Sequence, residues 1–298
     1  MCLILFSWKT DPEYPFIVAA NRDEFYQRPT APLSLWDNSP VIAGRDQQEG
    51  GTWLGITAKG RFAAVTNYRR GAEMGSTFAK SRGKLCRDFL EGEMNVAEFL
   101  ASLDSDAMDY GGFNVLVSDG LSLGYGSNRF FLSQKACGLK SQAYYHYEAD
   151  LAPGVYGLSN HRLNTPWPKV TQTKAAFSRV LDQFKLTDHL RLKHGVVDEA
   201  DLLHVLLNSQ AAVDAMLPDT GIGIEKERFL SPSFIQTSLD YGTRASTILI
   251  RDRLERQTLM EQSWLAGGEK GCRTVIQLPS RQSLHERHGD ALSPDTFI

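Results

Sequence analysis

The chain has 298 residues, of which 42% are hydrophobic and 22% charged, and its formal net charge is −3. This composition is typical of a globular protein, and the lack of a basic surplus argues against a nucleic-acid partner. No apolar run has the length of a membrane span, and the opening run 1–6 lacks the basic flank and cleavage site of a signal peptide. The four cysteines form no CxxC pair and have no histidine at metal spacing, so we expect neither disulfides nor a metal site, and a cytoplasmic location with reduced thiols.

Strand-like segments open the chain. They are 2–8 and 16–20, turned by Asp11-Pro12, then 52–57 and 61–67, turned by Lys59-Gly60. Apolar residues then recur at helical spacing over 81–103, which predicts an amphipathic helix there. Further strands are predicted at 113–118 and 121–125 around Asp119-Gly120, and at 129–133, 143–147 and 155–159. Helices over 166–184 and 199–207 precede three late strand-like segments, 237–239, 246–250 and 273–278.

This order of elements predicts an α+β fold. Two antiparallel sheets packed face to face, with the amphipathic helices outside, would bury the apolar face of every strand group. No linker divides the sequence, so we expect residues 1–298 to form one domain, with a frayed polar tail from about residue 282.

Cys2 is the first residue with a chemical role to consider. Removal of Met1 would leave a thiol and a free α-amine on one residue, and that amine, with a pKa of about 8, is able to act as the base for its own thiol. The alternative is that Cys2 is a small apolar residue at the start of a buried strand.

A polar cluster, Asn21-Arg22-Asp23-Glu24, ends the strand that pairs with the Cys2 strand. An arginine there would lower the pKa of the thiol and hold a substrate carboxylate, and an acid would orient the amine. A local salt bridge at a strand exit would use the same residue types.

Three further polar residues lie at strand ends. Asn67 and Asn160 each follow an apolar strand, where a side-chain N–H would suit an oxyanion hole, although turns also favour asparagine. Arg244 precedes the apolar run 248–250, where it would stabilise anionic charge or simply lie at the surface.

Weaker signals concern ligand binding. Trp53 follows Gly50-Gly51, a pair that permits close backbone approach to a ligand but also suits a plain turn. His146 and His161 are each able to ligate haem iron, yet no haem motif surrounds either one.

Together these segments resemble a known family. The tetrapeptide Asn21-Arg22-Asp23-Glu24 is the signature of the NRDE family, also called the transport and Golgi organisation family. Met1-Cys2, the segments 50–55, 65–69 and 157–160, and the segment 241–247 extend the resemblance over nearly the whole chain.

The resemblance implies an N-terminal-nucleophile (Ntn) hydrolase-like fold, a four-layer αββα sandwich, with bile-salt hydrolases and penicillin V acylases as relatives. It implies Cys2 as nucleophile, with Arg22, Asn67, Asn160 and Arg244 as site residues. The relatives carry their aspartate a few residues beyond the arginine, whereas here Asp23 is adjacent, so Asp23 and Glu24 share the role of orienting the amine.

Two functions follow from the resemblance. The first is an amide hydrolase that uses Cys2 after Met1 removal and requires no cofactor. The second is a non-catalytic protein that binds haem as cargo, or an acyl-CoA or lipid, in the same cleft. Candidate binding residues for either function are Asn21, Glu24, Trp53 and His161.

Overall fold

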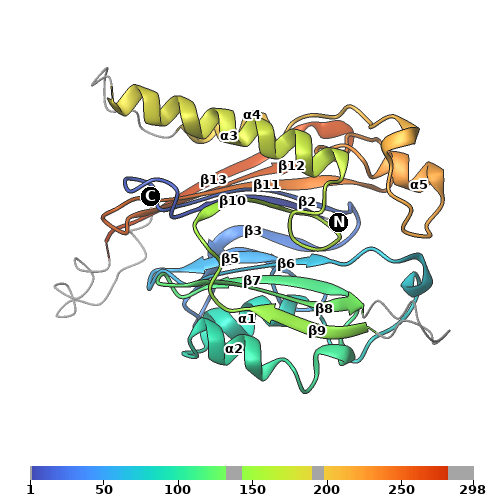
Figure 1. Cartoon of the computed structure of the whole chain (residues 1–298), viewed down its shortest axis with the longest axis horizontal. Coiled ribbons are helices and arrows are strands. Elements are labelled where there is room, and N and C mark those ends of the chain that lie inside the picture. Colours follow the sequence, from blue (N-terminus) through green and yellow to red (C-terminus); the bar gives the residue numbers. More distant parts are fainter. Residues whose placement is uncertain (1, 132–142, 190–197, 281–298) are drawn as a thin grey trace.

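The computed structural model describes residues 2–131, 143–189 and 198–280. Its strands form two antiparallel sheets (Figure 1). The first sheet contains, in chain order, β1 (Cys2–Trp8), β2 (Phe16–Phe25), β10 (Gly154–Leu158), β11 (Tyr241–Arg251), β12 (Gln257–Trp264) and β13 (Lys270–Leu278). The second contains β3 (Thr30–Leu35), β4 (Val41–Asp46), β5 (Leu54–Thr57), β6 (Phe62–Asn67), β7 (Phe113–Ser118), β8 (Leu123–Phe131) and β9 (Ala143–Glu148). The spatial orders are β10-β1-β2-β11-β12-β13 and β3-β4-β5-β6-β7-β8-β9.

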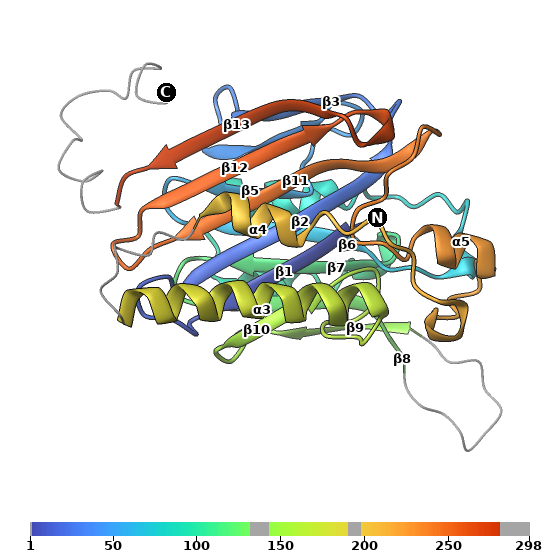
Figure 2. The ribbon, with the colours of Figure 1, turned by 90° about the horizontal axis from the view of Figure 1, so that it is seen from above.

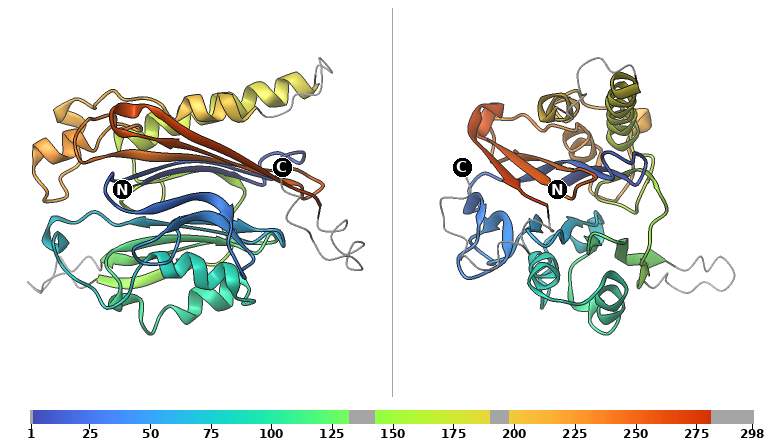
Figure 3. Two further views of the ribbon diagram at one scale, coloured as in Figure 1. Left: turned by 180° about the vertical axis from the view of Figure 1, so that it is seen from behind. Right: turned by 90° about the vertical axis from the view of Figure 1, so that its left-hand side faces the viewer.

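Helices cover the outer faces of both sheets. Figure 2 shows α3 (Pro168–His189) and α4 (Glu199–Val205) lying over the first sheet. On the far side, α1 (Gly83–Glu91) and α2 (Val96–Ser102) pack against the second sheet (Figure 3). The short α5 (Ile224–Phe229) lies at one end, and 3-10 turns occur at Gly71–Glu73, Ala107–Asp109, Asp214–Met216 and Ala266–Gly268. The predicted αββα sandwich is therefore confirmed.

The main core lies between the sheets. Phe16 of β2 meets Phe62 of β6 edge to face, with ring centroids 5.1 Å apart, and both side chains are buried. All residues of β1 are buried, because one face packs on the other sheet and the other face packs under α3. Burial on both faces explains why the opening run is continuously apolar rather than alternating.

Several elements differ from the sequence prediction. Strand β2 continues through Asn21-Arg22-Asp23-Glu24 to Phe25, so the tetrapeptide lies within a strand rather than at its exit. The predicted helix 81–103 is two helices, because α1 ends at Glu91 with Gly92 as its C-cap, and Asn95 caps the start of α2 with a capping box. Residues 129–131 continue β8 and do not start a new strand.

Other differences concern strands that were missed or wrongly expected. β3, β4 and β12 were not predicted, since β3 contains Pro32 and β12 mixes polar with apolar residues. The segment 237–239 is not a strand; the Thr237 carbonyl accepts hydrogen bonds from loop groups instead. Cys137 and the tail from residue 282 lie outside the described residues.

None of the helices in the described part of the chain combines the length and the apolar character needed to cross a membrane.

Candidate active site

A pocket of about 630 Å³ lies at one end of the sandwich and is lined by residues of both sheets. One wall comes from β1, β2, β11 and β12, and the opposite wall from β3, β4 and β6. The segment 76–84, which leads into α1, closes part of the rim. Cys2 lies in this pocket and is 8% exposed.

Cys2 and Arg22 are adjacent across neighbouring strands. They are Cα partners in the antiparallel β1–β2 pair, and Arg22 is in turn the partner of Ala245 on β11. Burial raises the pKa of the Cys2 thiol, and the positive charge of Arg22 acts against that shift. Ser159 fixes the backbone here, because its Oγ donates to the Cys2 carbonyl at 3.0 Å.

The two acids of the tetrapeptide lie on opposite faces of β2, as consecutive strand residues must. Glu24 lines the pocket, where its Oε2 lies 3.7 Å from Arg22 Nη2 and 4.0 Å from Arg28 Nε. Asp23 also lines the pocket but is only 1% exposed, and its Oδ1 accepts a hydrogen bond of 2.7 Å from Thr243 Oγ1. Burial raises the pKa of Asp23, while nearby Lys169 opposes the rise.

Asn67 and Asn160 take different positions. Asn67 ends β6 and lines the pocket, on the sheet opposite Cys2. Asn160 is fully buried, and its Nδ2 donates to the Asn67 carbonyl at 3.0 Å. The amide N–H of Asn160 is therefore already used to hold the strand end that carries Asn67, and only Asn67 presents its side chain to the pocket.

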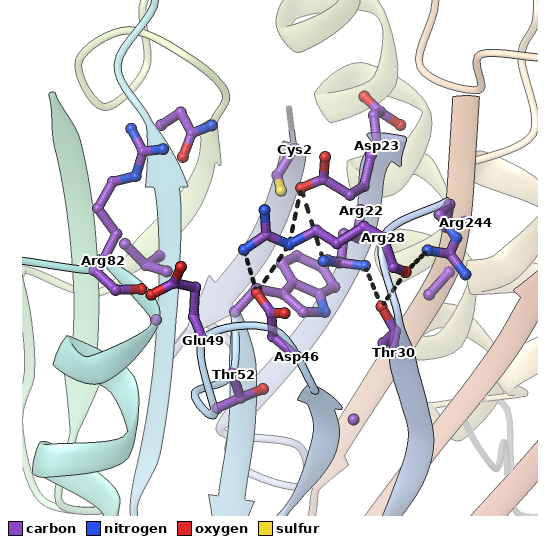
Figure 4. A pocket seen from close by; sticks show the side chains of 18 of the residues that line it. Cys2, Arg22, Asp23, Arg28, Thr30, Asp46, Glu49, Thr52, Arg82 and Arg244 are labelled. Atoms are coloured by element: carbon purple, nitrogen blue, oxygen red, sulfur yellow. Dashed lines mark hydrogen bonds and ion pairs between the residues drawn. The ribbon is translucent and has the colours of Figure 1, made fainter. Parts of the chain in front are cut away.

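Arg244 and Trp53 also line the pocket. Arg244 Nη1 donates to the carbonyls of Phe25 and Arg28, so its charge faces backbone oxygens rather than a carboxylate (Figure 4).

Two candidate binding residues lie elsewhere. Asn21 is completely buried, where Nδ2 donates to the carbonyls of Leu206 at 2.9 Å and Ser233 at 2.7 Å, beneath the helical layer. His161 packs between Tyr68 and Trp167 and hydrogen-bonds Thr165 Oγ1 at 2.8 Å. Neither side chain lines the pocket, because both are used in packing.

Comparison with known proteins agrees with the sequence signature. The sequence profile of the family Transport and Golgi organisation 2 matches residues 1–266. The chain belongs to this family. It is 34% identical to a Transport and Golgi organization protein 2 homolog of Bos taurus, covering 89% of this chain and 94% of that protein. The corresponding figures for the Homo sapiens homolog are 32%, 89% and 94%.

Two solved structures are more distant. One is a Caenorhabditis elegans N-acylethanolamine-hydrolyzing acid amidase ortholog, with TM-score 0.43 and 13% identity over 84% of this chain and 92% of that one. The other is a mutant conjugated bile acid hydrolase from Clostridium perfringens, with TM-score 0.43 and 10% identity over 95% and 93% of the two chains. At this similarity neither structure adds to what the sheets themselves show.

The structure adds pocket residues that the sequence prediction missed. Arg28 reaches across the pocket, and its Nε and Nη2 both donate to Asp46 Oδ2, at 2.9 and 2.6 Å (Figure 4). Arg82 lies on the rim and donates to the Gly112 carbonyl at 3.3 Å. These residues come from loops and strand ends without a sequence motif, so only chain folding brings them to Cys2.

A buried charge layer behind the pocket was also missed. Lys169, in the first turn of α3, is 4% exposed and donates to the Leu230 carbonyl at 3.0 Å. Burial, helped by the charge of Arg69, lowers the pKa of Lys169 to about 8. Arg69 itself forms a buried ion pair with Glu227. A lysine near the start of an amphipathic helix carries no sequence signal for such a position.

Proposed function

We propose that this protein hydrolyses a small-molecule amide, with Cys2 as an N-terminal nucleophile once Met1 is removed. The observation that carries the proposal is the cross-strand pairing of Cys2 with Arg22 in a pocket whose opposite wall presents Asn67. Nucleophile, cation and amide donor are the groups that acyl transfer needs. Membership of the family and the resemblance of its motifs to Ntn hydrolases support the same chemistry.

The first half of the reaction forms an acyl-enzyme. The Cys2 α-amine accepts the thiol proton while sulfur bonds to the amide carbonyl carbon. Asn67 Nδ2 donates to the resulting oxyanion. The C–N bond then breaks, and the α-ammonium returns its proton to the leaving amine.

The second half releases the acid. Water attacks the thioester carbonyl, the α-amine takes the proton of that water, and sulfur leaves with its bonding electrons. The proton then returns to sulfur, and a carboxylic acid is the second product. Because burial raises the pKa of the thiol, Arg22 has the task of favouring the thiolate at the moment of attack.

The test is intact mass of the protein from its own host, followed by incubation with a panel of amides. We expect the mass of a chain that begins at Cys2, and a transient acyl adduct on that residue. Cys2→Ala should abolish the adduct and the turnover, whereas Cys2→Ser should retain a slow reaction. A chain that keeps Met1, or turnover unchanged in Cys2→Ala, would contradict the proposal.

A second candidate function rests on the arginines of the pocket. Arg82 and Arg244 hydrogen-bond backbone carbonyls, so their charges stay available to the phosphates of an acyl-CoA or the propionates of haem. Cys2 would be the axial ligand for haem iron. In the described part of the chain no three metal-binding side chains cluster.

Titrating the protein with haem or with an acyl-CoA distinguishes the binding function from the hydrolase function. Haem should change the Soret band, or an acyl-CoA should give a calorimetric signal that weakens in Arg82→Gln and in Arg244→Gln. Absence of both signals removes the binding function. The cytoplasmic location stays a prediction for either function.

A further inference from the structure

The pocket is elongated across the strands of the first sheet. Cys2, Arg22, Ala245 and Ser263 are successive partners on β1, β2, β11 and β12, and all of them line it. Neighbouring strands lie about 4.8 Å apart, so three steps separate the two ends of this row by roughly 14 Å. A ligand that reaches from Cys2 to β12 is therefore extended and crosses the strands.

A carboxyl group stands at the far end of this row. Glu261 lies two residues before Ser263 on β12, so both side chains face the same side of the sheet. Glu261 is 8% exposed and lines the pocket, with its Cα roughly 16 Å from that of Cys2 when the step along the strand is included. The proposed mechanism at Cys2 does not use this group.

One oxygen of Glu261 is engaged and the other is open. Oε1 accepts a hydrogen bond of 2.9 Å from the Leu33 backbone N–H on the facing sheet. Oε2 has no hydrogen bond to any residue in the described ranges, and it faces Gly44. A Cβ at Gly44 would lie 3.2 Å from Oε2, so the glycine leaves this oxygen accessible from the pocket.

The surroundings of Glu261 favour a cationic partner. A buried carboxylate is costly unless it is paired and hydrogen-bonded. The nearest cation, Arg22, already contacts Glu24 and Thr30. The other pocket residues nearest this end, on β3, β4, β12, β13 and the turn after β12, are neutral, among them Ala31, Pro32, Gly44, Ser263, Trp264, Leu265 and Cys272. Burial raises the pKa of Glu261, and a bound cation would reverse that rise.

We propose that the pocket binds an extended amide whose far end carries a protonated amine, and that Glu261 accepts a hydrogen bond from this amine. The scissile carbonyl would lie at Cys2, and the ammonium would approach Oε2 from the pocket, beside Gly44. This inference rests on the proposed function for the reaction at Cys2, but the recognition by Glu261 requires only that ligands enter the same pocket.

Chloroacetamide probes test the inference without any hydrolysis. The Cys2 sulfur displaces chloride to form a thioether, and the thiol proton passes to the buffer. The probes have tails of graded length that end in an ammonium, a hydroxyl or a methyl group. The exposed Cys272 is replaced by Ser in every variant to prevent its reaction, and peptide mapping locates the adduct.

We expect the long ammonium probe to alkylate Cys2 at least about tenfold faster than the methyl probe of equal length, a difference of about 1.4 kcal/mol. Glu261→Gln should remove that preference, since its amide oxygen still accepts from Leu33 but carries no charge. Gly44→Ala should weaken the preference by crowding Oε2. Iodoacetamide, which has no tail, should react equally with all variants and so reports an intact thiol.

An equal preference in Glu261→Gln, or no preference in the unmodified pocket, would overturn the inference. A hydroxyl probe as fast as the ammonium probe would overturn the assignment of a cation. Failure of the amide panel together with an intact ammonium preference would remove the hydrolase function and leave the Glu261 site standing.

Discussion

The guanidinium of Arg69 and the carboxylate of Glu227 lie 2.6 Å apart, with side chains only 5% and 3% exposed. Arg69 lies two residues after Asn67, which ends β6, and Glu227 lies in α5. Glu227 also accepts hydrogen bonds from the backbone N–H and the hydroxyl of Thr220. This ion pair therefore fastens α5 and its preceding loop to the strand end that forms part of the pocket.

We expect Glu227→Gln to destabilise the fold by about 3 kcal/mol, because it leaves the Arg69 cation buried without its counter-charge. Replacing both partners, Arg69→Met with Glu227→Leu, should recover much of this loss. Urea denaturation gives the free energies of unfolding. Arg228→Gln is the control, since its exposed ion pair with Asp214 should matter little. Equal effects at residues 227 and 228 would refute the role of burial.

Replacing Asn67 by alanine should lower turnover, whereas replacing Asn160 should lower the stability of the fold. If amides are substrates, Asn67→Ala should lower kcat about 100-fold or more by removing an oxyanion donor, with little change in stability. Asn160→Ala should destabilise the protein by about 1–3 kcal/mol, because it strips the Asn67 carbonyl of a buried donor. Measuring kcat and the free energy of unfolding in urea for both variants distinguishes the two effects. A purely structural loss in Asn67→Ala would count against the oxyanion role.

The packing of His161 predicts a pH dependence. Burial lowers the pKa of His161 from 6.5 to about 4, so the folded state favours the neutral ring. Between pH 6.5 and 4 the unfolded chain therefore binds more protons, and the stability contribution is lost as the pH falls through this window. The stability difference between the wild type and His161→Phe should shrink from pH 7 to pH 4. A difference independent of pH would show that the ring does not titrate as argued.

Asn21 illustrates a signature residue with a structural task. Its amide donates to two backbone carbonyls, and its Oδ1 accepts from Ser246 Oγ at 2.5 Å. Asn21→Ala should cost about 3 kcal/mol of stability by leaving these buried groups unpaired. The exposed Gln27, on the connection after β2, provides the control in Gln27→Ala. Normal thermal stability of Asn21→Ala with lost ligand binding would instead favour a direct binding role.

Much of the fold was predictable because its signals are local. The opening strand, the hairpins at Lys59-Gly60 and Asp119-Gly120, and α3 are recognisable from periodicity and turn residues. β3 and β12 were not, because their residues suit a strand only when neighbouring strands supply hydrogen bonds. Pro32 is tolerated since β3 is an edge strand, and polar β12 lies between β11 and β13.

The sequence by itself determined the family, the αββα layers, and Cys2, Arg22, Asn67 and Arg244 as candidate site residues. Only the tertiary structure decided which of the signature residues face the pocket. Alternation along β2 places Arg22 and Glu24 on one face of the strand and Asn21 and Asp23 on the other, yet Asp23 still lines the pocket, and only Asn21 is buried away from it beneath the helical layer. The register between strands, a long-range property, placed Ser263 in line with Cys2 and Glu261 two residues along β12 on the same face, and no local pattern in the chain encodes that alignment.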